Sequence, residues 1–130
     1  MHPLLTGWLE KLEPYRIDPQ GFQGYSGELD RYEAEMLTFL RNYDAIVCPA
    51  YTQPALAHGA SILDDNFRGF SHTMAFNLTG WPAAVVCCGE SSSGLPIGVQ
   101  VAARPWREDV ALAVAASLEK ALGGWKAPEL

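Results

Sequence analysis

Cysteine and histidine are the side chains of this sequence whose types and order first suggest catalysis. Cys48 precedes His58 and His72, and a thiol next to an imidazole is a nucleophile in enzymes that form covalent intermediates. The two groups need to meet only in space, so their spacing along the chain leaves this pairing open. A small buried cysteine more often packs as a hydrophobic residue. We therefore keep a Cys48–histidine pair as a minor hypothesis and expect packing to be the main role of Cys48.

A metal site is the second possibility, and it would combine these side chains with one of two neighbouring carboxylates. Its candidate ligands are Cys48, His58, His72 and either Asp64 or Asp65. Zinc sites in proteins usually contain paired ligands a few residues apart, as in Cys-x-x-Cys or His-x-x-x-His. The sequence contains neither spacing. We therefore predict no metal and no other cofactor.

Serine and lysine form the third possible pair, because a neutral lysine can take the proton of a nucleophilic serine. The serine cluster Ser91–Ser93 is followed by Gly94 and lies between two apolar runs, a pattern typical of a solvated hairpin turn. A lysine that acts as a base must be desolvated, whereas the lysines here are expected to be exposed and charged. They are Lys11, Lys120 and Lys126. The sequence therefore predicts no catalytic residue.

Helices that could position these groups are indicated by apolar side chains at helical spacing. The clearest signal covers residues 28–43, where one face carries Leu29, Tyr32, Met36, Phe39, Leu40 and Tyr43. Ser26 is the expected N-terminal cap of this helix. Glycine, proline and glutamine predict a surface loop over 17–27 and an irregular loop over 50–69. Further helices are expected over 3–13 and 107–122, and a short helix or turn over 70–79.

Short apolar runs predict the strands. Those at 44–48 and 83–88 favour strands buried on both faces, and the alternation from Ile97 to Ala102 favours a strand with one buried face. The serine turn joins the last two strands into an antiparallel hairpin. The predicted fold class is α/β, with a small mixed sheet covered by helices and made of this hairpin plus at least one further strand. So narrow a sheet has exposed edges, which suggests that more protein flanks it.

Length and charge limit the functional classes. A chain of 130 residues favours a single domain over 1–130, and 48% hydrophobic residues are enough for a core. The formal net charge of −6 disfavours nucleic acid and anionic membrane as partners, because both attract clustered basic side chains. No apolar run reaches the length of a membrane-spanning helix.

Cysteine content indicates the compartment. The chain has 3 cysteines, which are too few, and odd in number, for a disulfide framework. Cys87 and Cys88 are adjacent, so their side chains are expected on opposite faces of a strand. The amino terminus lacks the basic start and apolar core of a signal peptide. We expect a cytoplasmic protein.

Several motifs, in this order, resemble the carboxy-terminal part of the amidase signature family. The most specific are Asp44 to Pro49 followed by Thr52-Gln53-Pro54, then Phe76 to Pro82, and then Gly94 to Gln100. Arg104-Pro105-Trp106, before an alanine-rich helix, fits the same pattern. The resemblance covers residues 44–126, and residues 1–43 are less diagnostic.

The resemblance implies the chemistry of the family and also implies that this chain lacks the residues that perform it. Members of the family hydrolyse carboxamides with a Ser–Ser–Lys triad and a backbone oxyanion hole, without metal or cofactor. Their fold is an α/β/α layered one, of which this chain would be a part. The family's triad lies upstream, in a Gly/Ser-rich segment that this chain does not contain. The resemblance thus implies an amidase segment without nucleophile or catalytic lysine, inactive alone.

The resemblance also implies candidate substrate-pocket residues in this chain. In a complete enzyme Thr52, Met74, Phe76 and Asn77 could face substrate. The alternative is structural: Asn77 could serve only to cap a turn and Phe76 could belong to the core.

Two functional interpretations follow. The first is the carboxy-terminal structural portion of an amidase, which would meet a small amide substrate only where the upstream catalytic half is present. The alternative is a stand-alone interaction or oligomerisation module derived from an amidase, or one half of a split amidase. The expected protein partner is therefore a second copy of the chain, as a homo-oligomer, or a complementing chain. A small independent enzyme that uses Cys48 with His58 or His72 is a third hypothesis.

Overall fold

The computed structural model describes residues 3–60, 66 and 68–127. These residues form two compact units, Met1–Met36 and Leu37–Leu130, and each unit is treated by itself. The prediction of a single domain over 1–130 stays a prediction.

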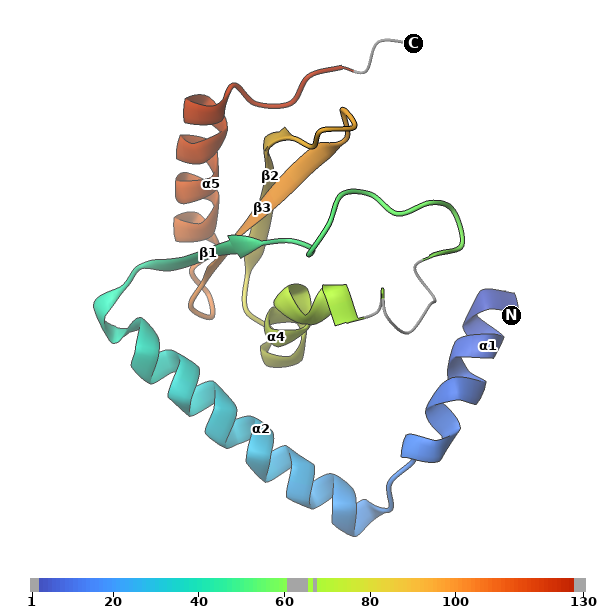
Figure 1. The fold of residues 1–130 in the computed structure, drawn as a ribbon. Helices are drawn as coiled ribbons and strands as arrows, with labels where there is room; N and C mark the ends of the chain where they lie inside the picture. The colour runs from blue at the N-terminus through green and yellow to red at the C-terminus, as the bar shows by residue number, and fades with distance from the viewer. Residues whose placement is uncertain (1–2, 61–65, 67, 128–130) are drawn as a thin grey trace. The chain divides into compact units, whose positions relative to one another are not determined.

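The first unit consists of helix α1 (Pro3–Leu12), the 3-10 turn η1 (Glu13–Tyr15) and most of helix α2 (Pro19–Phe39) (Figure 1). The predicted loop over 17–27 is wrong, because α2 already begins at Pro19. The Asp18 carboxylate accepts a hydrogen bond of 2.7 Å from the backbone N–H of Gly21, and proline is well suited to the first helical position. This Asp-Pro start stabilises the helix despite its glycines.

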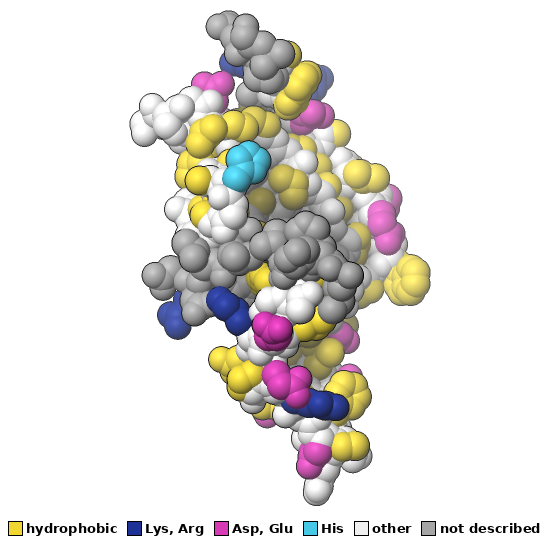
Figure 2. Space-filling view, turned by 90° about the vertical axis from the view of Figure 1, so that its right-hand side faces the viewer, with side chains coloured by type: hydrophobic (Ala, Val, Ile, Leu, Met, Phe, Trp, Pro, Cys, Tyr) yellow, Lys and Arg dark blue, Asp and Glu magenta, His cyan; other side chains and the backbone are white. Residues whose placement is uncertain are grey.

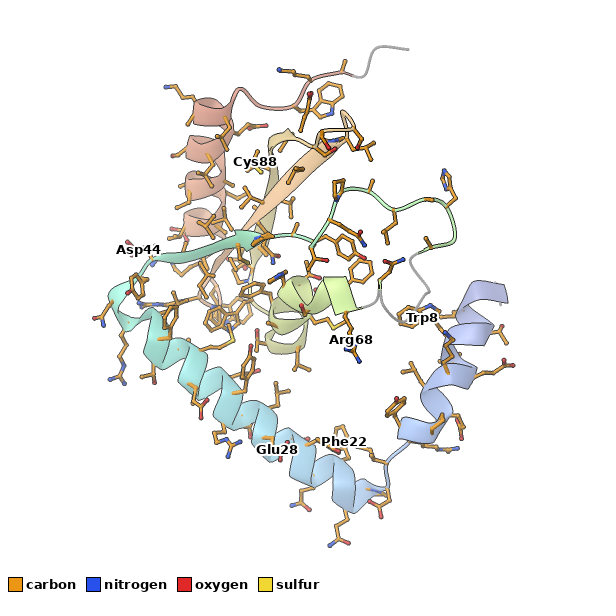
Figure 3. All side chains as sticks on the ribbon, in the orientation of Figure 1. Trp8, Phe22, Glu28, Asp44, Arg68 and Cys88 are labelled. Atoms are coloured by element: carbon orange, nitrogen blue, oxygen red, sulfur yellow. The ribbon has the colours of Figure 1, made fainter. Side chains whose placement is uncertain are left out.

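The start of α2 also changes the role of Ser26. Its hydroxyl donates to the carbonyl oxygen of Phe22 at 3.0 Å, within the helix, so Ser26 is not the predicted cap. None of the side chains of α2 is buried, and Phe22, which projects from the helix in Figure 3, is 64% exposed. The helix continues into the 3-10 turn η2 (Leu40–Asn42), where Leu40 is fully buried.

The second unit is built on a three-stranded sheet of β1 (Ala45–Pro49), β2 (Ala83–Glu90) and β3 (Pro96–Ala103), in the order β1-β3-β2. The predicted hairpin of β2 and β3 is confirmed, and so is the α/β class. Both pairings are antiparallel, so the described sheet is not mixed: β1 runs opposite to β3, as β2 does. Helix α5 (Glu108–Leu122) packs against all three strands (Figure 1).

Burial is concentrated on the central strand. Residues 100–103 of β3 are buried on both faces, which contradicts the predicted one-sided strand. Conversely, Val47 on β1 is 51% exposed and Val85 on β2 is 58% exposed, so these strands are not buried on both faces. A pattern of apolar residues does not say which strand becomes central, and β1 and β2 lie at the edges of the described sheet.

Helix α4 (Ser71–Thr79) follows the 3-10 turn η4 (Arg68–Phe70), so the short helix or turn predicted over 70–79 is a helix. It ends at Gly80, which has the left-handed backbone (φ 68°) that favours glycine. Helix α5 ends in the same way at Gly123, with φ 87°. Residues 50–60, the described start of the loop predicted over 50–69, contain no helix or strand longer than a turn.

The surface carries charges of both signs. On the face shown in Figure 2, acidic and basic side chains are interspersed with hydrophobic ones, and the described part of this face shows no broad basic patch. Among the described residues, no helix combines the length and the apolar character needed to cross a membrane.

Candidate functional site

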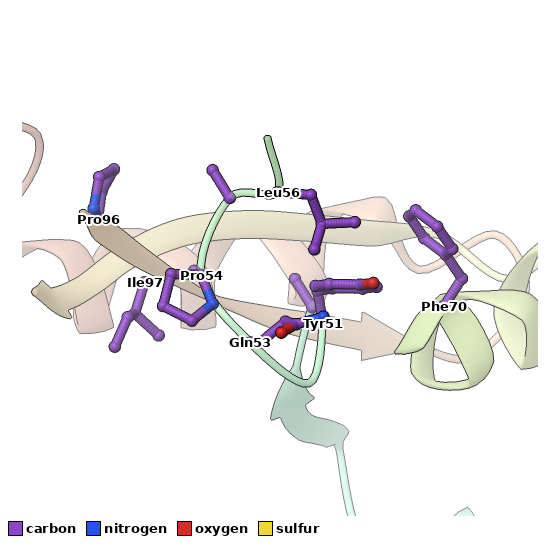
Figure 4. Close-up of a pocket in the computed structure, with 10 residues that line it drawn as sticks. Tyr51, Gln53, Pro54, Leu56, Phe70, Pro96 and Ile97 are labelled. Atoms are coloured by element: carbon purple, nitrogen blue, oxygen red, sulfur yellow. The ribbon is translucent and has the colours of Figure 1, made fainter. Parts of the chain in front are cut away.

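A pocket of about 390 Å³ lies in the second unit, where three segments meet (Figure 4). The loop after β1 supplies most of its wall, Phe70 closes one end, and the start of β3 closes the other. The residues that line it are Ala50, Tyr51, Gln53, Pro54, Ala55, Leu56, Phe70, Pro96, Ile97 and Gly98. Among the described residues, this lining is mostly apolar and includes no charged side chain.

The Tyr51 ring is held in place from three directions. Its hydroxyl donates to the carbonyl oxygen of Asn66 at 2.6 Å, and its ring packs against Phe70 with 4.7 Å between centroids. Behind it lies Gly69, which is buried. A Cβ at Gly69 would lie 2.3 Å from the Tyr51 ring, so only glycine allows this packing. This wall of the pocket is therefore preformed.

Gln100 connects the elements behind the pocket. It is a buried polar side chain on β3, with 2% of its surface exposed. Its Nε2 donates to the carbonyl oxygen of His72 in α4 at 2.7 Å, and lies 3.4 Å from that of Pro49 at the end of β1. The amide thereby ties two segments that lead into the pocket walls to the central strand. The alternation along β3 predicts Gln100 on the exposed side of a one-sided strand, and this prediction is wrong. A lone glutamine in an apolar strand is the available signal for its buried role.

The predicted pocket residues lie elsewhere. Phe76 is buried against Trp81, with 6.4 Å between ring centroids, and Met74 is half-buried in α4. Thr52 and Asn77 are exposed. None of these four side chains lines the pocket of Figure 4, and their contact with a substrate stays a prediction.

The polar side chain next to Cys48 is an amide. The Cys48 Sγ lies 3.3 Å from Nε2 of Gln100. Within the described part of the chain, neither His58 nor His72 forms a hydrogen bond to it, so the geometry gives the Cys–His hypothesis no support. No three potential metal ligands come together among the described residues. Two of the predicted ligands, Asp64 and Asp65, lie outside the residues that the structure describes.

The serine cluster forms a turn, as predicted. The Ser91 and Ser93 hydroxyls are 2.9 Å apart, and the Leu95 N–H donates to the Ser91 hydroxyl at 3.1 Å. The backbone N–H of Gly94, whose φ is 77°, donates to the Ser91 carbonyl. These hydroxyls stabilise the turn of the hairpin and are exposed to solvent. The lysines are exposed, which leaves no desolvated base among them.

Comparison with known proteins identifies what the chain is similar to. A family model described as "Amidase" matches residues 22–112. The chain is 28% identical over 116 residues to human "Fatty-acid amide hydrolase 2", covering 89% of this chain and 21% of that protein. It is 33% identical over 112 residues to "6-aminohexanoate-cyclic-dimer hydrolase" of a Pseudomonas species, covering 75% of this chain and 22% of that protein.

The comparison with solved structures finds the same kind of hydrolase. The structure of 6-aminohexanoate cyclic dimer hydrolase superimposes with a TM-score of 0.69 and 30% sequence identity, over 82% of this chain and 25% of that one. The chain thus spans about a quarter of the solved hydrolase and about a fifth of the two relatives above.

Proposed function

The chain belongs to the amidase family, and from this premise we propose that it is the carboxy-terminal structural portion of a carboxamide hydrolase and is inactive alone. The observation that carries the proposal is the match of the fold to a quarter of a solved hydrolase, combined with described residues that contain neither a desolvated lysine nor a serine backed by a base. In this role the chain supplies sheet, helices and pocket wall to an active site whose nucleophile comes from other residues.

An activity measurement tests the proposal. The purified 130-residue chain should release no p-nitroaniline from an aryl amide, and a fluorophosphonate that labels activated serines should leave it unmodified. A mock preparation from cells without the gene gives the background. Hydrolysis that follows the chain through gel filtration and disappears in Cys48→Ala or Ser91→Ala would show that the chain carries its own catalytic group.

The alternative is a split amidase, in which a second chain carries the triad. It is favoured by the unpaired outer edge of β2 in the described sheet and by the exposed Val85 on that strand, since both could be covered by another polypeptide. Co-expression with the upstream portion of a related amidase should then give a complex that hydrolyses amides. Activity that arises only in the mixture would favour this arrangement, and failure to associate would count against it.

A cytoplasmic location is part of the proposal. Cys48, Cys87 and Cys88 are free thiols in the structure, and unpaired cysteines are typical of a reducing compartment. Fractionation of the source cells, with the chain detected by antibody, is the measurement that decides it.

A further inference from the structure

Helix α2 carries a stripe of apolar side chains whose spacing is that of a coiled coil. Successive members of the stripe are three and four residues apart in strict alternation, the spacing that keeps side chains on one face towards a partner helix. The stripe consists of Phe22, Tyr25, Leu29, Tyr32, Met36 and Phe39. We call these residues the seam of α2.

The seam is only partly covered in the described structure. No side chain of α2 is buried, and on the seam Phe22 is 64% exposed, Tyr25 is 61% exposed and Phe39 is 58% exposed. Leu29 and Met36 are half-buried. Removal of such side chains from water is a main driving force of protein association. The seam can therefore supply the apolar contact area for a partner.

The glycines inside α2 lie off the seam and make the helix depend on packing. A Cβ at Gly24 or Gly27 would meet no atom within 4 Å, so neither glycine is required by a close contact, and both lower the intrinsic stability of a helix. In proteins, most of the stability of a helix comes from packing of its amphipathic face. A partner that covers the seam would therefore also stabilise α2.

The positions that flank the seam are acidic. In a coiled coil, the residues beside the apolar positions face those of the partner helix, and their charges select the partner. Within the seam these flanking positions are Ser26, Glu28, Glu33 and Glu35. Arg31 lies 3.9 Å from the Glu35 carboxylate, but the two side chains are 75% and 71% exposed, and so exposed a pair is weak. Two copies of α2 would bring glutamates together, whereas lysine or arginine flanks would attract them.

We propose that the seam of α2 binds an amphipathic helix of a partner protein, whose own apolar stripe is flanked by lysine or arginine. The apolar seam supplies the contact area, and the acidic flanks favour a basic helix over a second copy of this chain. The inference concerns α2 alone and needs neither the pocket nor a catalytic triad. Its test is therefore independent of the proposed amidase role. Phe22 of the seam and Glu28 of its flank both project from α2 in Figure 3.

Two synthetic peptides form a matched pair of probes for the full chain of 130 residues. Both are about three heptads long with leucine at the apolar positions, and their flanking positions are lysine in one and glutamate in the other. Titration calorimetry should give a Kd on the order of 10 µM for the lysine-flanked peptide. The glutamate-flanked peptide should bind at least roughly 30-fold more weakly. Raising NaCl from about 0.05 M to about 0.5 M should weaken the lysine-flanked complex several-fold.

Variants of α2 locate the interface. Leu29→Gln on the seam should weaken binding of the lysine-flanked peptide roughly tenfold. Leu37→Gln, the same change off the seam at a position that is 41% exposed, should alter it by less than roughly twofold. The combined variant Glu28→Lys, Glu33→Lys and Glu35→Lys should reverse the preference, so that the glutamate-flanked peptide binds more tightly. Glutamine and lysine are good helix formers, and circular dichroism checks that helix content is kept. The charge variant remains decisive even where Leu29→Gln loses helix.

Several results would overturn the proposal. They are an absence of saturable binding up to about tenfold above the expected Kd, equal affinity for the two peptides, equal effects of the two leucine variants, and an unchanged preference in the charge variant. Dimerisation of the chain that Leu29→Gln abolishes and Leu37→Gln leaves intact would make a second copy the occupant of the seam, and would overturn the proposal as well.

Discussion

At the scale of single residues, Gln100 is a buried polar side chain whose hydrogen bonds a substitution can test. Its side chain is 2% exposed and its Nε2 serves the carbonyl oxygen of His72. Replacing it by leucine keeps the bulk but leaves that carbonyl and the half-buried Cys48 sulfur without the donor. Gln100→Leu should lower the free energy of unfolding by about 1–3 kcal/mol, measured by urea denaturation. The control Gln23→Leu, at an exposed position of α2, should change it by less than about 0.5 kcal/mol. Equal effects of the two variants would contradict a structural role for the buried amide.

The stability of the folded protein should become pH-dependent in the variant Gln100→Glu. Only the protonated carboxyl can donate to the His72 carbonyl, and burial raises the pKa of a carboxyl group. A raised folded-state pKa means that the folded state binds more protons than the unfolded chain. Stability is then fully present below the unfolded pKa and is lost as pH rises through the folded value. The deficit relative to the wild type should grow between about pH 4 and pH 8 in parallel urea titrations. A deficit that is constant with pH would refute the donor role.

At the scale of elements, replacing either of two glycines by alanine should change the stability in opposite directions, because their backbone conformations differ. Gly80 ends α4 with φ 68°, and a Cβ there would meet no atom within 4 Å, so the cost of Gly80→Ala is conformational and should be about 1–2 kcal/mol. Gly24 lies inside α2 with open space around its Cβ. Gly24→Ala should instead stabilise the helix by about 0.5–1 kcal/mol. Thermal unfolding followed by circular dichroism measures both, and destabilisation by Gly24→Ala would contradict α2 as the structure has it.

The start of α5 carries an ion pair between Arg107 and Asp109, which a titration can test. The Arg107 guanidinium donates to both carboxylate oxygens of Asp109 at 2.9 and 3.1 Å, and this hydrogen bonding lowers the pKa of Asp109. A lowered folded-state pKa contributes stability above the unfolded value, which is lost as pH falls through the folded one. In Arg107→Ala, the Asp109 pKa should rise towards its ordinary value in an NMR titration. Arg107→Gln serves as a control that keeps most of the length but not the charge, and an unshifted Asp109 in both variants would exclude the pair.

Elements were predictable where a local signal specifies them. The glycine that ends α4, the serine turn between β2 and β3, and the alanine-rich α5 all follow from short-range chemistry. The Asp18-Pro19 start of α2 is an equally local signal. The glycines that follow it nevertheless favour a loop, which is why the sequence predicts a loop over 17–27. Burial of the strands was not predictable in this way, because it depends on β3 becoming central. The pocket is harder still to predict, because its walls come from segments far apart in the sequence, as Tyr51, Phe70 and Ile97 show.

At the scale of the whole molecule, the sequence already indicated that the sheet is too narrow to stand alone. In the second unit, the described sheet ends at β2, a strand that is apolar up to Glu90 and carries neither lysine nor proline. Natural proteins usually protect such an edge with charges, prolines or covering segments. The first unit adds exposed apolar side chains of its own, including Tyr15 at 77% and Phe22 at 64%. A chain that spans about a quarter of a related hydrolase is expected to expose surfaces that such a protein would cover.

Self-association should therefore occur when nothing else covers the edge, and we propose that β2 is where it starts. The purified chain is expected to form dimers or larger species at roughly 100 µM in light scattering, since an uncovered apolar strand is a template for pairing. Val85→Lys places a charge on the exposed face of β2, where the valine is 58% exposed, and should shift the chain towards monomer because charged side chains on an edge strand oppose pairing. Leu112→Lys introduces the same charge on an exposed helix position and should leave the association unchanged. A compact monomer at that concentration, or equal effects of the two lysines, would exclude the β2 edge as the interface.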